Sequence, residues 1–148
     1  MADQRTEHLE REAHNWAEFE RLVRLVPLDR WEASDVLEGW TVKGMLWHVA
    51  GWIDEANQHL EQMAAGTFEE PKEEDEDDTD DRNAAFADAS RSMNADAVWT
   101  GLLAARELCR RRWEELPEVT DRAIEEFASE TYQHYKEHVP DLERAAQP

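Results

Sequence analysis

The sequence predicts an all-α protein, a four-helix bundle built as one domain. Apolar residues recur every three or four positions in four long blocks, which is the period of one face of an α-helix. Glycine and proline are scarce, with five of each among 148 residues, and the alternation of a β-strand is missing. A chain of this length is typical of one domain, and amphipathic helices with mostly short connections pack as an antiparallel bundle.

The first predicted helix covers residues 6–26. Its apolar positions form one stripe, and Pro27 follows directly and ends the block because proline cannot continue a helix. A connector, residues 28–40, leads to the next helix. It contains Trp31, so we expect it to pack against the bundle.

The second predicted helix covers residues 41–65. Thr41 is a suitable N-cap, because its hydroxyl can accept from a free backbone N–H of the first turn. Gly66 stands where a glycine commonly ends a helix. The acidic stretch 69–81 follows, and we expect it to form a long loop between the second and third helices.

The third predicted block covers residues 83–116, with Pro117 after its last residue. Asn94 is a candidate N-cap inside this block. Two arrangements are therefore open for residues 83–92, which form either a short helix of their own or the first turns of the third helix.

The fourth predicted helix covers residues 120–146 and has Thr120 as its N-cap. Pro140 lies within this block, and we expect it to kink or end the helix because it lacks a backbone N–H. Residues 141–146 would then add one further turn.

Charge and composition exclude several classes of partner. The formal net charge is −20, which argues against nucleic acid and against docking on anionic membranes. No apolar run approaches the roughly 20 residues that a membrane span needs, and the N-terminus carries no apolar signal segment. A cytoplasmic location is therefore expected. The single Cys109 fits a reducing compartment and is interpreted as a buried structural thiol rather than a nucleophile.

The acidic stretch 69–81 has two interpretations. The simpler one is a solvated connector, which needs no bound ion. The other is a site for a hard cation, but the stretch lacks the spaced ligands and the central glycine of an EF-hand loop. We favour the connector.

Three histidines form the one pattern in the chain that indicates chemistry. His134 and His138 are four residues apart, so they lie on one face of the fourth helix and continue its apolar stripe. His48 lies at the edge of the stripe of the second helix. Three imidazoles with one open position are typical of a catalytic divalent metal site, at which water or a thiol can bind. We predict such a site at His48, His134 and His138, most readily for zinc or nickel.

The other histidines are weaker candidates. His8 and His14 fall on a charged part of the first helix and are expected to be exposed. His59 lies about 16 Å from His48 along the helix axis, too far to share an ion. Residues that could orient the ligand imidazoles, with an exposed helix surface as the alternative for each, are Glu130, Tyr135 and Glu137.

Seven tryptophans supply most of the aromatic surface. The first group, expected in the core, is Trp16, Trp99 and Trp113. The second group surrounds His48 and forms either core or the wall of an apolar pocket over the metal: Trp40, Trp47 and Trp52. Trp47 and Trp99 lean outward in this arrangement and could form the two-fold interface of a homodimer.

The segment GWTVKGMLWHVA, residues 39–50, resembles the second-helix motif of the DinB superfamily, written GW-[ST]-V-x-D-L-L-x-H-x-A. His48 falls on its ligand histidine, and Gly44 replaces its acidic residue. His134 and His138 fall where the fourth-helix ligand pair of that family lies. The nearest branch is the metal-binding domain of mycothiol-dependent maleylpyruvate isomerase, and the resemblance covers the chain, residues 1–148, in helix order.

This resemblance implies a DinB-like four-helix bundle with a divalent metal at one end and a low-molecular-weight thiol, such as mycothiol, as cofactor. It also implies a homodimer, and a reaction on a small electrophilic substrate by an S-transferase or isomerase-like enzyme. The chain ends at Pro148 without the C-terminal domain that accompanies the isomerase, so we expect thiol transfer or another metal-dependent reaction. The alternative is a non-catalytic metal-binding or stress-related bundle protein.

Overall fold

The structure is a computed structural model that describes residues 3–72 and 76–148. It confirms the all-α class, since these two ranges contain helices and an isolated bridge between Leu37 and Trp40. The elements in chain order are α1 (Gln4–Leu25), the short 3-10 helix η1 (Leu28–Arg30), α2 (Val42–Ala65), α3 (Glu76–Arg91), α4 (Ala95–Glu114), α5 (Asp121–Glu130) and α6 (Tyr132–Ala145). None of these helices is long and apolar enough to cross a membrane.

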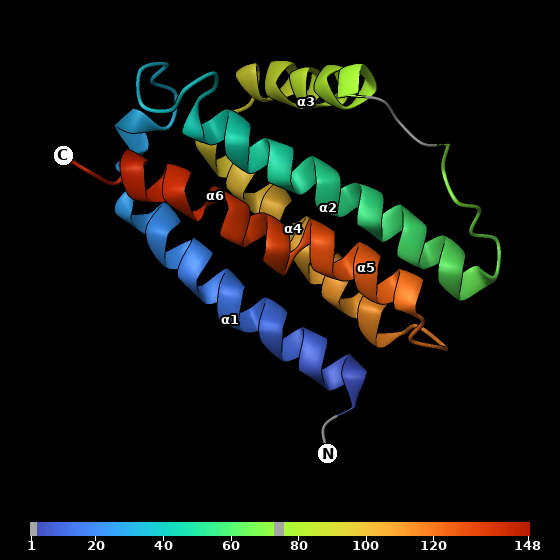
Figure 1. Cartoon of the computed structure of the whole chain (residues 1–148). Coiled ribbons are helices and arrows are strands. Elements are labelled where there is room, and N and C mark those ends of the chain that lie inside the picture. The colour runs from blue at the N-terminus through green and yellow to red at the C-terminus, as the bar shows by residue number, and fades with distance from the viewer. Residues whose placement is uncertain (1–2, 73–75) are drawn as a thin grey trace.

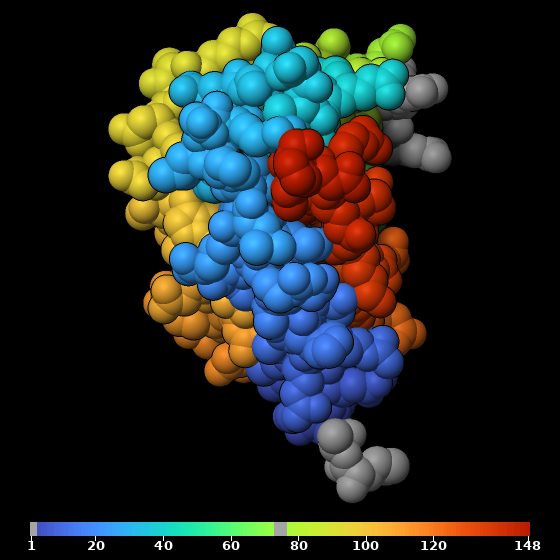
Figure 2. All heavy atoms as spheres, turned by 90° about the vertical axis from the view of Figure 1, so that its left-hand side faces the viewer, coloured from blue at the N-terminus to red at the C-terminus, as the bar shows by residue number. Residues whose placement is uncertain are grey.

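The bundle consists of α1, α2, α4 and a fourth rod formed by α5 and α6 in succession (Figure 1). The most extensive contact joins α2 to α4, and α1 packs mainly on α6. Helix α3 lies outside the bundle along α2 (Figure 1). The connector of residues 28–40 lies beside the last turns of α6 at one end of the molecule (Figure 2).

The predicted caps define the helix boundaries. Thr41, Asn94 and Thr120 each accept a hydrogen bond from the backbone N–H three residues further on, as the sequence predicts for N-caps. Asp3 does the same for α1. Gly66 ends α2 with φ of 75°, a left-handed conformation that costs glycine little.

Of the two arrangements open for residues 83–92, the separate helix is the one that forms, so the predicted block 83–116 is divided and its predicted start is wrong. The chain forms two helices there, and α3 begins at Glu76, inside the stretch 69–81 that was expected to be a loop. Acidic residues favour the first turn of a helix, where they complement its dipole. Residues 69–72 are non-helical and exposed, and residues 73–75 lie outside the described residues.

The fourth block, expected to be one helix over residues 120–146, is interrupted at Thr131 rather than at Pro140. Thr131 has φ of −113° and ψ of −99°, and its hydroxyl donates to the carbonyl of Phe127, 2.6 Å away. The prediction that Pro140 kinks or ends the helix is wrong in its stronger form, because α6 continues through it to Ala145. The proline leaves the carbonyl of Lys136 without its helical N–H, and Lys136 is exposed, so water can replace that bond.

Aromatic rings fill the core and also cover its outer seams. The core tryptophans Trp16 and Trp113 are buried as expected, and Trp113 stacks on Phe127 with 4.6 Å between ring centroids. Trp99 is partly buried and stacks on Trp16. Trp47 packs against α4, so close to Gly101 that a Cβ there would lie 2.7 Å from the indole. Both Trp47 and Trp99 thus have intramolecular partners, and the two-fold interface stays a prediction.

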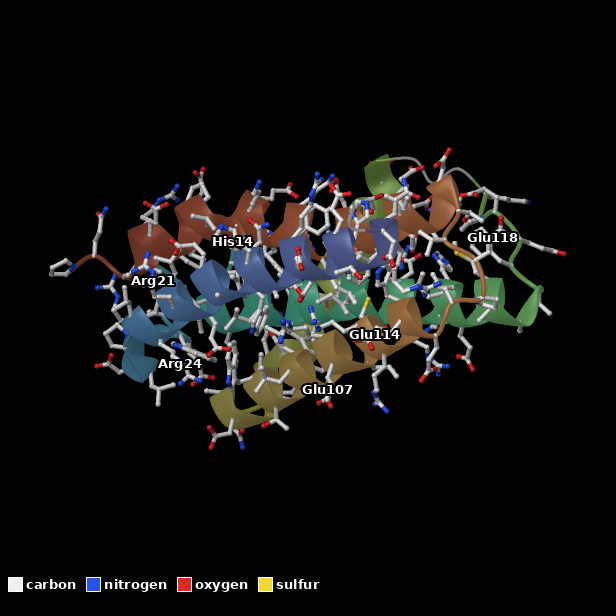
Figure 3. The ribbon with its side chains drawn as sticks, turned by 90° about the horizontal axis from the view of Figure 1, so that it is seen from below. His14, Arg21, Arg24, Glu107, Glu114 and Glu118 are labelled. Atoms are coloured by element: carbon white, nitrogen blue, oxygen red, sulfur yellow. The ribbon has the colours of Figure 1, made fainter. Side chains whose placement is uncertain are left out.

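The outer faces of the helices carry the charge. Figure 3 labels six exposed polar side chains on α1, on α4 and on the turn after α4, namely His14, Arg21, Arg24, Glu107, Glu114 and Glu118. The expectation that His14 is exposed is confirmed. Surface ion pairs on this face, such as that between Arg21 and Glu18, contribute little to stability because both partners are well solvated.

Candidate metal centre

Three imidazoles meet between α2 and α6. His48 extends from α2, and His134 and His138 extend from successive turns of α6. The Nε2 atom of His134 lies 3.0 Å from that of His48 and 3.1 Å from that of His138. One nitrogen from each ring lies within 4.8 Å of the others, and the described residues contain no other such group of histidine, cysteine or carboxylate ligands. The structure therefore brings together all three histidines that the sequence singles out.

Helix geometry explains this convergence. His134 and His138 are one turn apart, so their rings share a face of α6. The break at Thr131 lets α6 start with a new orientation, while α5 remains packed on α2. The residual exposure of each histidine is 6–7%, so the rings are buried but still touch the surface.

The surroundings of the rings are partly aromatic and partly acidic. Trp40 lies over the site, with its ring centroid 4.9 Å from that of His48 and 5.5 Å from that of His138. Trp40 is thus a wall of the site, one of the two roles that the sequence left open for it. Asp141, one turn beyond His138, has Oδ2 3.1 Å from Nδ1 of that histidine.

Burial keeps two of the rings neutral. It lowers the pKa of His48 to about 4, and repulsion from His138 adds to the effect. It lowers the pKa of His134 to about 3, again with repulsion from the neighbouring histidines. A neutral imidazole has a free lone pair on one nitrogen, which is the form that binds metals.

The donor set fits a divalent ion. Nitrogen ligands at about 2.05 Å from a tetrahedral zinc ion lie about 3.3 Å apart, close to the 3.0 and 3.1 Å that separate Nε2 of His134 from Nε2 of His48 and of His138. Metal-bound imidazoles carry the proton on Nδ1 and usually donate it. The carboxylate of Asp141 is placed to accept this hydrogen bond from Nδ1–H of His138. Nδ1 of His48 and Nδ1 of His134 have no protein partner among the described residues. Three histidines leave a fourth position open for a ligand.

The residues that the sequence suggested for orienting the imidazoles do not have that role. Glu137 is exposed, the hydroxyl of Tyr135 donates to Glu12, and Glu130 belongs to an acidic group with Glu126 and Glu55. Within the described residues no hydrogen bond joins them to the three histidines. Asp141 has this role for His138 instead. Its signal in the sequence is the spacing of three residues after His138, which puts both on one helix face.

Two other histidines have structural partners. The expectation that His8 is exposed is wrong, because His8 is buried and its Nδ1 lies 2.9 Å from the hydroxyl of Tyr132. Helix α1 packs against α6 at this point. The charged residues around His8 in the sequence give no sign of this contact. His59 is away from the triad, as predicted, and its Nδ1 lies 2.5 Å from Glu126 Oε1.

A buried carboxylate positions α6 relative to α1 and α4. Glu12 is fully buried and accepts two hydrogen bonds from Arg106, one from Arg110 and one from the hydroxyl of Tyr135, all 2.7–2.8 Å long. Tyr135 is the neighbour of His134 in the chain, so this network fixes the turn of α6 that carries the ligands. Glu12 stands in a charged run, and only the apolar positions around it hint at its burial.

Cys109 is a core residue, as the sequence suggests. It is buried on α4, and burial together with the surrounding carboxylates raises the pKa of its thiol, so the reactive thiolate is disfavoured.

These features define a class of protein, a helical bundle with an inward-facing histidine triad at one end. The chain matches the family model for the mycothiol maleylpyruvate isomerase N-terminal domain over residues 13–130, and it belongs to this family. The match includes His48, whereas His134 and His138 lie beyond its C-terminal limit, so their pairing with His48 rests on geometry. Comparison with curated proteins and with solved structures gave no match.

Proposed function

We propose that this protein is a metal-dependent enzyme that binds one divalent ion, zinc or nickel, through His48, His134 and His138. It uses a low-molecular-weight thiol such as mycothiol to act on a small electrophilic substrate, in an S-transferase or isomerase-like reaction. The observation that carries the proposal is the convergence of three buried imidazoles on one point. Membership of the mycothiol maleylpyruvate isomerase family supports the choice of a thiol.

The side chains around the triad have separable tasks. A divalent cation held there would lower the pKa of a thiol and polarise a carbonyl group of the substrate. His48 and His134 stay uncharged at neutral pH, so their lone pairs are available. Asp141 fixes the tautomer of His138 by accepting from Nδ1. The indole of Trp40 covers the rings and limits the access of water.

A thiol-conjugation assay tests the reaction. Metal-loaded protein is mixed with mycothiol or another small thiol and with a panel of epoxides and unsaturated acids, and loss of free thiol is followed. We expect metal-dependent turnover that His48→Ala reduces at least 100-fold with its helical circular dichroism unchanged. His14→Ala is the matched control, because His14 is exposed on α1.

The alternative, a non-catalytic metal-binding or stress-related protein, makes a different prediction in the same assay. It would bind the ion with all three histidines intact and show no turnover with any thiol and electrophile in the panel. That result would contradict the proposed enzyme and leave the metal site standing.

A further inference from the structure

A cleft of about 360 Å³ opens at the N-terminal end of α2, next to the histidines. Trp40 lines it and also contacts the rings of His48 and His138, so one indole separates the cleft from the triad. The remaining lining comes from the connector, from the start of α2 and from the end of α3.

The cleft is rich in hydrogen-bond donors. Lys43, Arg91, Ser34 and Ser90 line it, and two of these donors already have partners, since Arg91 donates to Asp88 and the Ser90 hydroxyl donates to the carbonyl of Ala87. Gly44 has no side chain that would fill the cleft. A Cβ there would lie 3.1 Å from Oγ1 of Thr41, in the space between α2 and α3. Arg91 pairs with Asp88, 2.6 Å away, and Glu32 also lines the cleft, so the cation that an anion would meet here is Lys43.

Lys43 is the central feature of this cleft. Its side chain is only 4% exposed, and a buried ammonium group needs compensation. Its Nζ donates to the carbonyl of Met93, 2.6 Å away, and to the carboxylate of Glu32. An ammonium group has three hydrogens, and the described residues provide two acceptors, so one donor remains for a ligand.

The partner carboxylate comes from an exposed side chain. Glu32 is 71% exposed and lies on the connector, so its carboxylate can leave Lys43 at little packing cost. A carboxylate from solution would make the same contact with Nζ of Lys43 that the exposed carboxylate of Glu32 makes.

We propose that this cleft binds the carboxylate of a small organic acid, with Lys43 as its principal contact, and that the acid displaces Glu32. This inference rests on the proposed function, because a carboxylate held here would be separated from the histidine triad only by the indole of Trp40. The acid could be the electrophilic substrate or a small thiol that carries a free carboxylate, such as N-acetylcysteine, and the two share the same recognition chemistry.

Binding can be followed by NMR through the backbone amides of Gly39 and Gly44, which line the cleft and belong to five glycines in all. The full chain is titrated, with and without zinc, with maleate and with N-acetylcysteine. N-acetylcysteine amide, which lacks the carboxylate, and inorganic phosphate are the comparison ligands. We expect saturable shifts of both glycines with one or both acids, none with the amide, and a weaker response to phosphate. The acid that binds identifies the source of the carboxylate.

Two substitutions decide the assignment. Glu32→Gln removes the competing carboxylate and should tighten binding at least threefold. Glu38→Gln removes the same charge from an exposed connector residue outside the cleft, and should change affinity less than twofold. Lys43→Met should abolish the shifts and Lys43→Arg should restore part of them. If Lys43→Met does not fold, the comparison of the two glutamine variants still tests the proposal.

The outcomes separate this inference from the metal site. Glycine shifts that persist in His134→Ala would support a cleft that works without the ion. Equal affinities of Glu32→Gln and Glu38→Gln, or no shifts in a protein that binds zinc normally, would overturn the cleft and leave the metal centre intact. Stronger shifts with phosphate than with either acid would also overturn it, because they would indicate an anion site without selectivity for carboxylates.

Discussion

At the scale of single residues, the carboxylate of Glu12 is the side chain with the most structural consequence. It joins α1 to Arg106 and Arg110 of α4 and to Tyr135 of α6 through four hydrogen bonds. Breaking a buried charge pair from one side leaves the other charges uncompensated, which costs far more than losing a surface pair.

We therefore expect Glu12→Gln to lower the free energy of unfolding by about 3 kcal/mol. Urea denaturation followed by circular dichroism measures this. Glu10→Gln is the control, since Glu10 is exposed two positions earlier in the same helix. If both variants unfold at the same urea concentration, the buried network does not have the importance assigned to it.

Glu130 makes stability depend on pH. Burial, with repulsion from Glu126 and Glu55, raises its pKa from 4.5 to about 8. The folded state therefore holds a proton on Glu130 that the unfolded state releases above pH 4.5. This favours the folded state at low pH, and the advantage is lost as the pH rises toward 8.

We expect Glu130→Gln to melt at a higher temperature than the parent at pH 8, with the gap closing toward pH 5. Thermal melts at several pH values give the two curves. Glu137→Gln, which removes an exposed charge from α6, should stay parallel to the parent across the range. Parallel curves for Glu130→Gln as well would show that this carboxyl titrates normally.

The spacing of His134 and His138 along one helical stripe, and the position of His48 at the edge of another, were enough to predict that the three histidines meet. The supporting residues were harder to predict, because their roles come from contacts between distant helices. Asp141 is a local exception, one turn from its histidine. Glu12 and His8 stand among charged residues, and only the packing of α1 on α6 shows that both are buried.

At the scale of helices, the ends were predictable and one break was not. N-caps act through local hydrogen bonds, so the sequence marks Thr41, Asn94 and Thr120 directly. The break at Thr131 has no proline or glycine to signal it. It coincides with a change of packing partner, since α5 packs mainly on α2 and α6 mainly on α1.

The attachment of α3 to α2 depends on a glycine. A Cβ on Gly51 would lie 2.5 Å from a ring carbon of Phe86, so the ring of Phe86 packs directly on the backbone of α2 at this glycine. The indole of Trp52 also donates to the side chain of Asn83 on α3, 2.8 Å away.

These contacts predict a change of sign in a double-mutant cycle. Gly51→Ala alone should destabilise the protein, because the methyl group pushes Phe86 and α3 away. In a Phe86→Ala background the same substitution should stabilise by up to about 1 kcal/mol, which is the helix propensity difference between alanine and glycine. The free energies of unfolding of the four proteins test this, and an equal effect of Gly51→Ala in both backgrounds would contradict it.

At the scale of the whole molecule, metal binding and folding should be coupled. The ligands come from α2 and α6, which are far apart in the sequence, so the site exists only in the folded chain. A ligand at a hundredfold excess over its dissociation constant stabilises the folded state by about 2.7 kcal/mol. For a domain of this size that corresponds to a rise in melting temperature of roughly 5–10 °C.

Calorimetry of zinc-loaded and chelator-treated protein measures this shift. The rise should disappear in His134→Ala and remain in His59→Ala, since His59 pairs with Glu126 away from the triad. An equal rise in both variants would place the ion elsewhere on this acidic surface.

The central claim is that His48, His134 and His138 hold one divalent ion. Its most direct test is elemental analysis of protein purified without chelator and without a nickel column, for the parent and for the three single alanine variants. We predict about one zinc or nickel ion per folded parent chain and loss of most of it in each variant, with His14→Ala unchanged. A parent without metal, or variants at His134 and His138 that keep the metal content of the parent, would contradict the claim.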